Sequence, residues 1–154
     1  MYSRNNRNSQ SINIKTVLLF ITSSFLYLMT GLIFLALELS GIISIRRDAI
    51  FIIWLFGFVA MIIFGLSYMF VSGLTRKKAF MNITMNYEFV FLNSGIILFF
   101  IGFSSIITYS TAKYFAVLGL ALLMTAVALH IVNLAYSALP EKSKNQGEGF
   151  ADKY

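Results

Sequence analysis

The sequence predicts an all-α, polytopic membrane protein, an antiparallel four-helix bundle that crosses a bilayer in up-down-up-down order. Four uncharged apolar runs of 22, 27, 24 and 27 residues predict it: Thr16–Leu37, Ala49–Thr75, Phe89–Ala112 and Tyr114–Pro140. Each is long enough for a helix that crosses a hydrocarbon core, which takes about 20 residues. The chain is also 58% hydrophobic, above the apolar content of about 45–50% in a soluble domain.

The first run predicts an uncleaved anchor that is also the first span. Its 22 residues exceed the apolar core of a secretory signal, and no small-residue cleavage site follows it. The connection Ser40–Asp48 joins it to the second span, and Gly41 is the expected helix breaker.

The second span carries a stripe of small and flexible side chains at four-residue steps: Gly57, Met61, Gly65, Met69 and Gly73. Residues four apart follow one slowly rotating face of a helix. Small residues let helices approach closely and methionine fills irregular space, so the stripe predicts a packing seam. A Cu(I) thioether site is the alternative, which neither a cysteine nor a second histidine supports.

The third and fourth spans are joined by a tight connection around Thr108–Lys113, and Pro140, the only proline, ends the last helix. Short connections force neighbouring helices to pack antiparallel. The expected organisation is a polar tail over residues 1–15, one transmembrane domain over 16–140, and a flexible tail over 141–154. The spans are expected at about 16–39, 49–74, 88–110 and 114–139.

The basic residues predict the orientation in a cell membrane. Three lie in each tail and three in the middle loop, against three on the other side (Arg46, Arg47 and Lys113). Because cytoplasmic loops accumulate Lys and Arg, both termini are expected in the cytoplasm. The net charge of +6 therefore has an explanation that requires no nucleic acid.

Several polar side chains are predicted to share one layer in the cytoplasmic half of the bundle. His130 is the only histidine, and a polar group at this depth is expected to face other helices. Asn133 lies one turn further along the same helix. The candidate cluster is His130, Asn133, Asn93, Tyr68 and Ser24. Its two interpretations are ordinary hydrogen bonding between helices, and a proton relay or ligand pocket.

The charged residues near the span ends are interpreted as interfacial. Glu38 is expected at the outer interface, where Arg46, Arg47 and Lys113 are available for a salt bridge. A proton or cation site at Glu38 is the alternative. Glu88 is predicted to form a charge pair at a helix end, beside the basic residues 76–78.

The sequence predicts neither catalysis nor a cofactor or metal. There is no Ser-His-acid set, no pair of carboxylates in a span, and no cysteine. Residues 76–78 (Arg-Lys-Lys) are interpreted as a topology signal, with a clamp for a lipid phosphate as the alternative.

Several short motifs resemble small four-span proteins related to the heme–copper oxidase subunit I-like superfamily. They are residues 30–35 (TGLIFL), 57–59 (GFV), 63–68 (IFGLSY), 91–95 (FLNSG) and 132–134 (VNL). The likeness covers about residues 26–138. The family typically has a histidine shortly before the span-two glycine, where this chain has Ile-Phe-Ile-Ile-Trp at 50–54. Since a membrane heme of that kind takes two axial histidines, the resemblance implies a scaffold without its heme ligands.

Two functions follow as hypotheses. The first is a non-catalytic accessory subunit of a larger membrane complex, such as a respiratory oxidase or another membrane metalloenzyme. The second is a small homo-oligomeric transporter or proton-coupled carrier that uses the inner polar cluster. In both, the partners are the lipid bilayer and either other membrane subunits or further copies of the chain.

Overall fold

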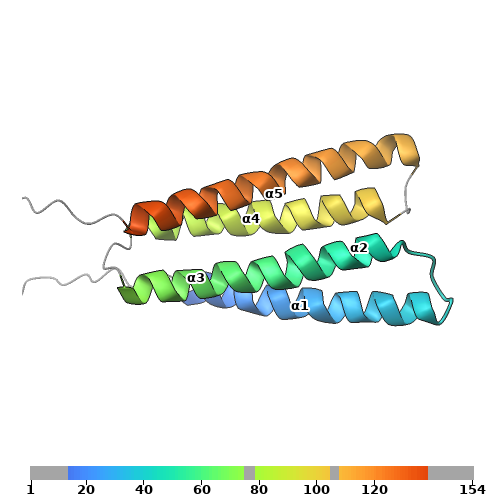
Figure 1. Cartoon of the computed structure of the whole chain (residues 1–154), viewed down its shortest axis with the longest axis horizontal. Coiled ribbons are helices and arrows are strands. Elements are labelled where there is room, and N and C mark those ends of the chain that lie inside the picture. Colours follow the sequence, from blue (N-terminus) through green and yellow to red (C-terminus); the bar gives the residue numbers. More distant parts are fainter. Residues whose placement is uncertain (1–13, 75–78, 105–107, 139–154) are drawn as a thin grey trace, which may run out of the picture.

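The computed structural model describes residues 14–74, 79–104 and 108–138, which form four helical rods lying side by side (Figure 1). The first rod is α1 (Ile14–Leu39). The second joins α2 (Arg47–Ile52), the π-helix η1 (Ile53–Ala60) and α3 (Met61–Leu74) end to end. The third and fourth are α4 (Ala79–Phe103) and α5 (Tyr109–Ala138). The predicted all-α fold is confirmed, and the described residues contain no strand.

All four rods are long and apolar enough to span a membrane: Ile14–Leu39, Arg47–Val71, Thr84–Phe103 and Tyr109–Tyr136. The order in which they cross the bilayer stays a prediction. The observed helix bounds differ most from the predicted spans in the second half of the chain, because α4 begins at Ala79 rather than near residue 88. The connection expected at Thr108–Lys113 is also misplaced, since α5 begins at Tyr109 and includes Lys113. A lysine with a long apolar stem fits inside a helix end near the membrane surface.

Much of the apolar side-chain surface points away from the bundle. Phe70, Val117 and Ile131 are 71%, 69% and 61% exposed. Exposed apolar surface on this scale is unfavourable in water and suits contact with lipid chains. The surface and the span lengths together indicate a multi-pass membrane protein.

The C-terminal end of α1 is a Schellman motif centred on Gly41. The Gly41 N–H donates to the Glu38 carbonyl at 3.0 Å, and the Ile42 N–H donates to the Leu37 carbonyl at 3.1 Å. Gly41 adopts φ of +71°, in the left-handed region that favours glycine. The predicted helix breaker is therefore at Gly41.

We predict that Gly41→Ala lowers the free energy of unfolding by about 1 kcal/mol. No heavy atom lies within 4 Å of the added Cβ, so the cost is conformational only. Thermal unfolding in detergent measures it. A variant as stable as the unmodified protein would contradict the assignment of strain to this φ angle.

The rods form two tightly packed pairs, which we call the first pair (α1 with α2–η1–α3) and the second pair (α4 with α5). In the first pair Gly31 meets Trp54, Gly57 meets Tyr27, and Gly65 meets Phe20. Residue numbers rise on one rod as they fall on the other, so the two rods run antiparallel. Figure 1 shows the same arrangement for both pairs.

In the second pair, glycines bring the two backbones together. Gly102 lies against the Ala116 backbone, and Gly119 lies against the Phe99 backbone and the Gly95 carbonyl. Small residues at such crossings are typical of helices packed in membranes. In these contacts, residue numbers rise along α4 as they fall along α5, so the two helices run antiparallel.

The predicted seam in the second span is present only in part. Gly57 and Gly65 meet α1, and Met61 is fully buried, whereas Met69 is exposed. Four-residue steps drift around a helix, because each step turns it by about 400°. The packing around Gly73 lies outside the described part of the structure.

The π-helix η1 was not predicted. It places Gly57 under the Tyr27 ring, where an added methyl group would lie 2.5 Å from Tyr27 Cγ. The Trp54 indole covers Gly31 in the same way. A π-helical turn shifts the faces of the helix that follows it, so η1 sets the direction in which α3 presents its polar residues.

The two pairs meet in an apolar core centred on Phe20. Its ring contacts Phe64 and Tyr68 of α3 and Phe89 of α4, with centroid separations of 6.2, 6.3 and 5.1 Å. Met61, Met85, Leu92, Ile96, Leu123 and Ala126 complete the buried cluster. Polar side chains lie within and beside this core, and they form the candidate site.

Candidate functional site

A buried carboxylate, Glu88, lies at the centre of a polar network that joins α3, α4 and α5. One of its oxygens, Oε2, accepts a hydrogen bond from the Tyr68 hydroxyl and lies 3.0 Å from His130 Nδ1. The other, Oε1, accepts from Asn133 Nδ2 at 3.2 Å. Glu88, Tyr68 and Asn133 are completely buried, and His130 is 5% exposed. We call these four residues, together with Ser67, the Glu88 network.

The ring of His130 is held in one orientation by its neighbours. It stacks on Phe64 with a centroid separation of 3.8 Å and an angle of 6° between the planes. The Tyr68 ring meets it edge-on at 4.9 Å. These contacts direct Nδ1 to Glu88 and Nε2 to Ser67 Oγ, which lies 2.8 Å away. Both ring nitrogens therefore have a polar partner.

Ser67 can form a hydrogen bond with His130 Nε2 whether or not that nitrogen carries a hydrogen. Its hydroxyl lies 2.8 Å from His130 Nε2 and 2.8 Å from the Phe64 carbonyl, and it has one hydrogen to donate. When Nε2 carries a hydrogen, Ser67 accepts it and donates to the Phe64 carbonyl. When Nε2 is bare, rotation of the hydroxyl lets Ser67 donate to it instead. Gain or loss of a hydrogen at Nε2 therefore leaves both ring nitrogens with a hydrogen-bond partner.

The Glu88–His130 contact is the only acid–base pair buried in the described part of the chain. A lone charge in an apolar layer is costly, whereas a carboxylate beside an imidazolium is neutral as a pair. The neutral alternative, a carboxylic acid that donates to a neutral imidazole, uses the same geometry. The arrangement can therefore hold a proton on either partner.

Helix periodicity explains how α4 and α5 supply these groups. Met85, Glu88, Leu92 and Ile96 recur at three- and four-residue steps on α4, and all four are fully buried. His130 and Asn133 lie one turn apart on α5. Since His130 precedes the end of α5 by eight residues, it lies about 12 Å from that end.

The interpretation of Glu88 as a charge at a helix end is wrong. Because α4 begins at Ala79, Glu88 lies nine residues inside the helix, with both oxygens on partners in the core. The residues before Glu88 include the polar Asn82, Thr84 and Asn86. Hydropathy alone therefore placed the start of the third span near residue 88, too late in the chain. The spacing of Met85, Glu88 and Leu92 was a signal that sequence reasoning missed.

Of the five residues predicted to cluster, the structure brings His130, Asn133 and Tyr68 together and leaves two apart. Asn93 accepts a hydrogen bond from the Tyr27 hydroxyl at 2.9 Å and donates to the Phe89 carbonyl. It follows Glu88 by five residues, which rotates it by about 140° around α4. Ser24 is buried but donates to the Ile21 carbonyl of its own helix at 2.6 Å.

The outer charges pair differently from the single salt bridge that was predicted. Arg47 Nε contacts Glu38 at 3.3 Å as expected, but Arg46 contacts Asp48 at 2.7 Å. Lys113 has no acidic partner among the described residues, and its Nζ lies 4.5 Å from the centre of the Tyr109 ring. The arginines are largely exposed, so these ion pairs contribute about 1 kcal/mol or less.

No protein-family model matches this chain, and neither a curated protein nor a solved structure matches it. The likeness to the heme–copper oxidase superfamily thus stays a prediction. Within the described residues, no group of three or more His, Cys, Asp and Glu side chains is placed to hold a metal ion.

Proposed function

We propose that this chain is a proton-coupled membrane carrier that works as a homo-oligomer and uses the Glu88–His130 pair as its proton site. The contact of 3.0 Å between the buried carboxylate and the imidazole is the observation that carries the proposal. Ionisable residues inside membrane spans are costly, and they mark proton relays and ion pathways. In this proposal both termini are cytoplasmic and the site lies in the cytoplasmic half of a cell membrane.

The polar contacts between the two pairs of helices support a coupled movement. Among the described residues, the side-chain hydrogen bonds that join them include Thr16–Asn86, Tyr27–Asn93, Ser67–His130, Tyr68–Glu88 and Asn133–Tyr68. Three of these bonds belong to the Glu88 network: Ser67–His130, Tyr68–Glu88 and Asn133–Tyr68. A change of proton in the network therefore alters the contacts on which the two pairs meet, as rocking of one unit against the other requires.

The filled core supports the homo-oligomer in this proposal. Phe20, Met61 and Leu92 occupy the centre of a single bundle and are 0% exposed. A route for a solute is therefore expected between copies of the chain rather than through one bundle.

The proposal predicts that Glu88→Gln lowers proton flux at least tenfold. Glutamine keeps the size and a side-chain oxygen, but its amide does not ionise and so cannot take up and release a proton as the carboxylate does. Flux is measured in proteoliposomes that contain a pH-sensitive dye and carry a pH gradient. His130→Leu is expected to reduce the flux similarly, because it removes the partner base.

Glu38→Gln is the matched control, since it removes an acid from the opposite end of the first pair and is expected to leave the flux unchanged. Flux through Glu88→Gln equal to that of the unmodified protein would refute the proton site. Flux no greater than that of protein-free vesicles would refute proton movement through the Glu88 network.

An accessory subunit of a membrane complex, such as a respiratory oxidase, is the second candidate. It is favoured by an apolar groove of about 270 Å³ between η1 and α5, lined by Phe56, Leu120, Leu123, Met124, Val127, Ala128 and Ile131. Such a groove fits a partner helix or a lipid chain. Purification in mild detergent tests this role: a chain that elutes without other subunits would exclude it.

A further inference from the structure

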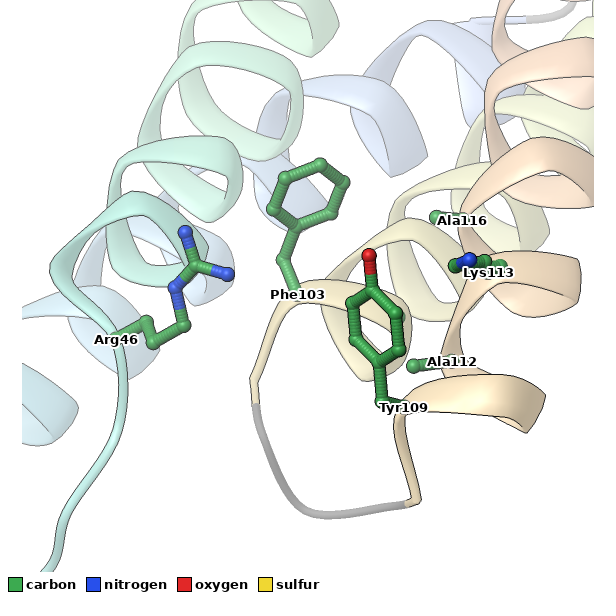
Figure 2. Close-up of a pocket in the computed structure, with 7 residues that line it drawn as sticks. Arg46, Phe103, Tyr109, Ala112, Lys113 and Ala116 are labelled. Atoms are coloured by element: carbon green, nitrogen blue, oxygen red, sulfur yellow. The ribbon is translucent and has the colours of Figure 1, made fainter.

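A pocket of about 310 Å³ lies at the end of the bundle opposite the Glu88 network (Figure 2). It is lined by Arg46, Gly102, Phe103, Tyr109, Ala112, Lys113 and Ala116. Lys113 precedes His130 by 17 residues on α5, so the two sites are about 26 Å apart along that helix. The pocket is therefore separate from the network and independent of the proposed carrier function.

Two cationic side chains from different pairs of helices line this pocket. Arg46 comes from the segment before α2, and its guanidinium carbon lies 5.9 Å from the centre of the Phe103 ring. Lys113 comes from α5, over the Tyr109 ring. Figure 2 shows Arg46 on one side of Phe103, with Tyr109 and Lys113 on the other.

The charged groups around the pocket leave a net positive charge that an anion can neutralise. Arg46 contacts Asp48 through one nitrogen, so its other N–H groups are not used by that ion pair. Arg47 and Glu38 compensate each other. Lys113 has no acidic partner among the described residues, and no acidic residue lies in the first turn of α5. An excess positive charge therefore lies where α5 also presents its positive dipole end.

We propose that this pocket binds a phosphate group, either the head group of an anionic phospholipid or a soluble phosphate. Arg46 and Lys113 would supply the charge and the Tyr109 hydroxyl a further donor. Gly102, Phe103 and Ala116 form an apolar wall that suits the glycerol and upper chains of a lipid. Basic pockets between helices near a membrane surface bind head groups in this way.

The test uses the purified full chain in phosphatidylcholine vesicles, with either inorganic phosphate or phosphatidylglycerol as the probe. Binding is measured by calorimetry for phosphate and by native mass spectrometry for the lipid. We expect Lys113→Gln and Arg46→Gln each to weaken binding about fivefold, the effect of one basic residue near a head group. Lys113 makes no hydrogen bond in the described structure, so its substitution leaves the fold intact.

Arg47→Gln is the matched control, because it removes the same charge from the neighbouring residue, which does not line the pocket. It is expected to leave the affinity within twofold. Retention of phosphatidylglycerol alone would assign the site to a lipid, and binding of inorganic phosphate would assign it to a soluble anion. Binding of neither probe, or equal losses in Lys113→Gln and Arg47→Gln, would overturn the proposal.

Discussion

Replacing Glu88 by alanine is expected to lower the free energy of unfolding by about 3 kcal/mol. The change removes both oxygens that Tyr68, His130 and Asn133 contact, so the buried Tyr68 hydroxyl and His130 Nδ1 lose their carboxylate partner. A buried polar group without a partner costs about 1–3 kcal/mol. Unfolding of the purified protein in mixed detergent micelles measures the loss.

A double-mutant cycle separates the pair from its surroundings. Glu88→Ala combined with His130→Ala is expected to cost less than the sum of the two single changes, because each single change already breaks the Glu88–His130 contact. Glu38→Ala is the control: its ion pair with Arg47 is exposed on the arginine side, so a loss below about 1 kcal/mol is expected. Additive losses in the cycle would contradict a coupled Glu88–His130 pair.

The four spans could be predicted because the signal is local. A charge-free run such as Ala49–Thr75 is long enough to cross a membrane whatever its neighbours do. The helix end at Gly41 could also be predicted, since only the conformation of that residue is involved. The start of α4 could not, because polar residues in its first turns resemble a loop when hydropathy is the only guide. The π-helix η1 leaves no comparable mark in a uniformly apolar run.

The Glu88 network could be predicted only in part, because its contacts join distant parts of the chain. Glu88 and His130 are 42 residues apart, and Ser67 and His130 are 63 apart. Depth along each span placed His130, Asn133 and Tyr68 in one layer. It could not show that Glu88 faces them or that Asn93 turns away, since rotation around α4 depends on where that helix begins. Short polar side chains such as Ser24 can also bond within their own helix.

The contacts within and between the pairs of helices differ in kind. Inside the second pair, backbones touch at glycines, and the Glu88–His130 contact also joins α4 to α5. Between the pairs, the apolar core around Phe20 is accompanied by hydrogen bonds from Ser67 and Tyr68 of α3 to His130 and Glu88. In lipid the hydrophobic effect does not hold helices together, so these bonds have a larger share in fixing the interface. A change of proton on Glu88 or His130 therefore acts both on the contact between α4 and α5 and on the hydrogen bonds between the pairs.

The close approach of the α4 and α5 backbones predicts a large effect of Gly119→Ala. Its Cβ would lie 2.4 Å from the Phe99 backbone nitrogen, so α4 and α5 must separate. Overpacking of this kind costs up to about 3 kcal/mol, and the higher helix propensity of alanine offsets about 1 kcal/mol. We expect a net loss of about 2 kcal/mol, measured by unfolding in mixed micelles.

Gly65→Ala is the matched control, because it makes the same change inside a helix of the first pair. There the closest atom to the new Cβ is the Ile21 side-chain Cγ1 at 3.1 Å, which can shift without moving a backbone. The gain in helix propensity then compensates the strain, and the stability is expected to stay within about 0.5 kcal/mol. Equal losses in the two variants would show that glycine flexibility, and not the close approach of α4 and α5, determines the stability of the second pair.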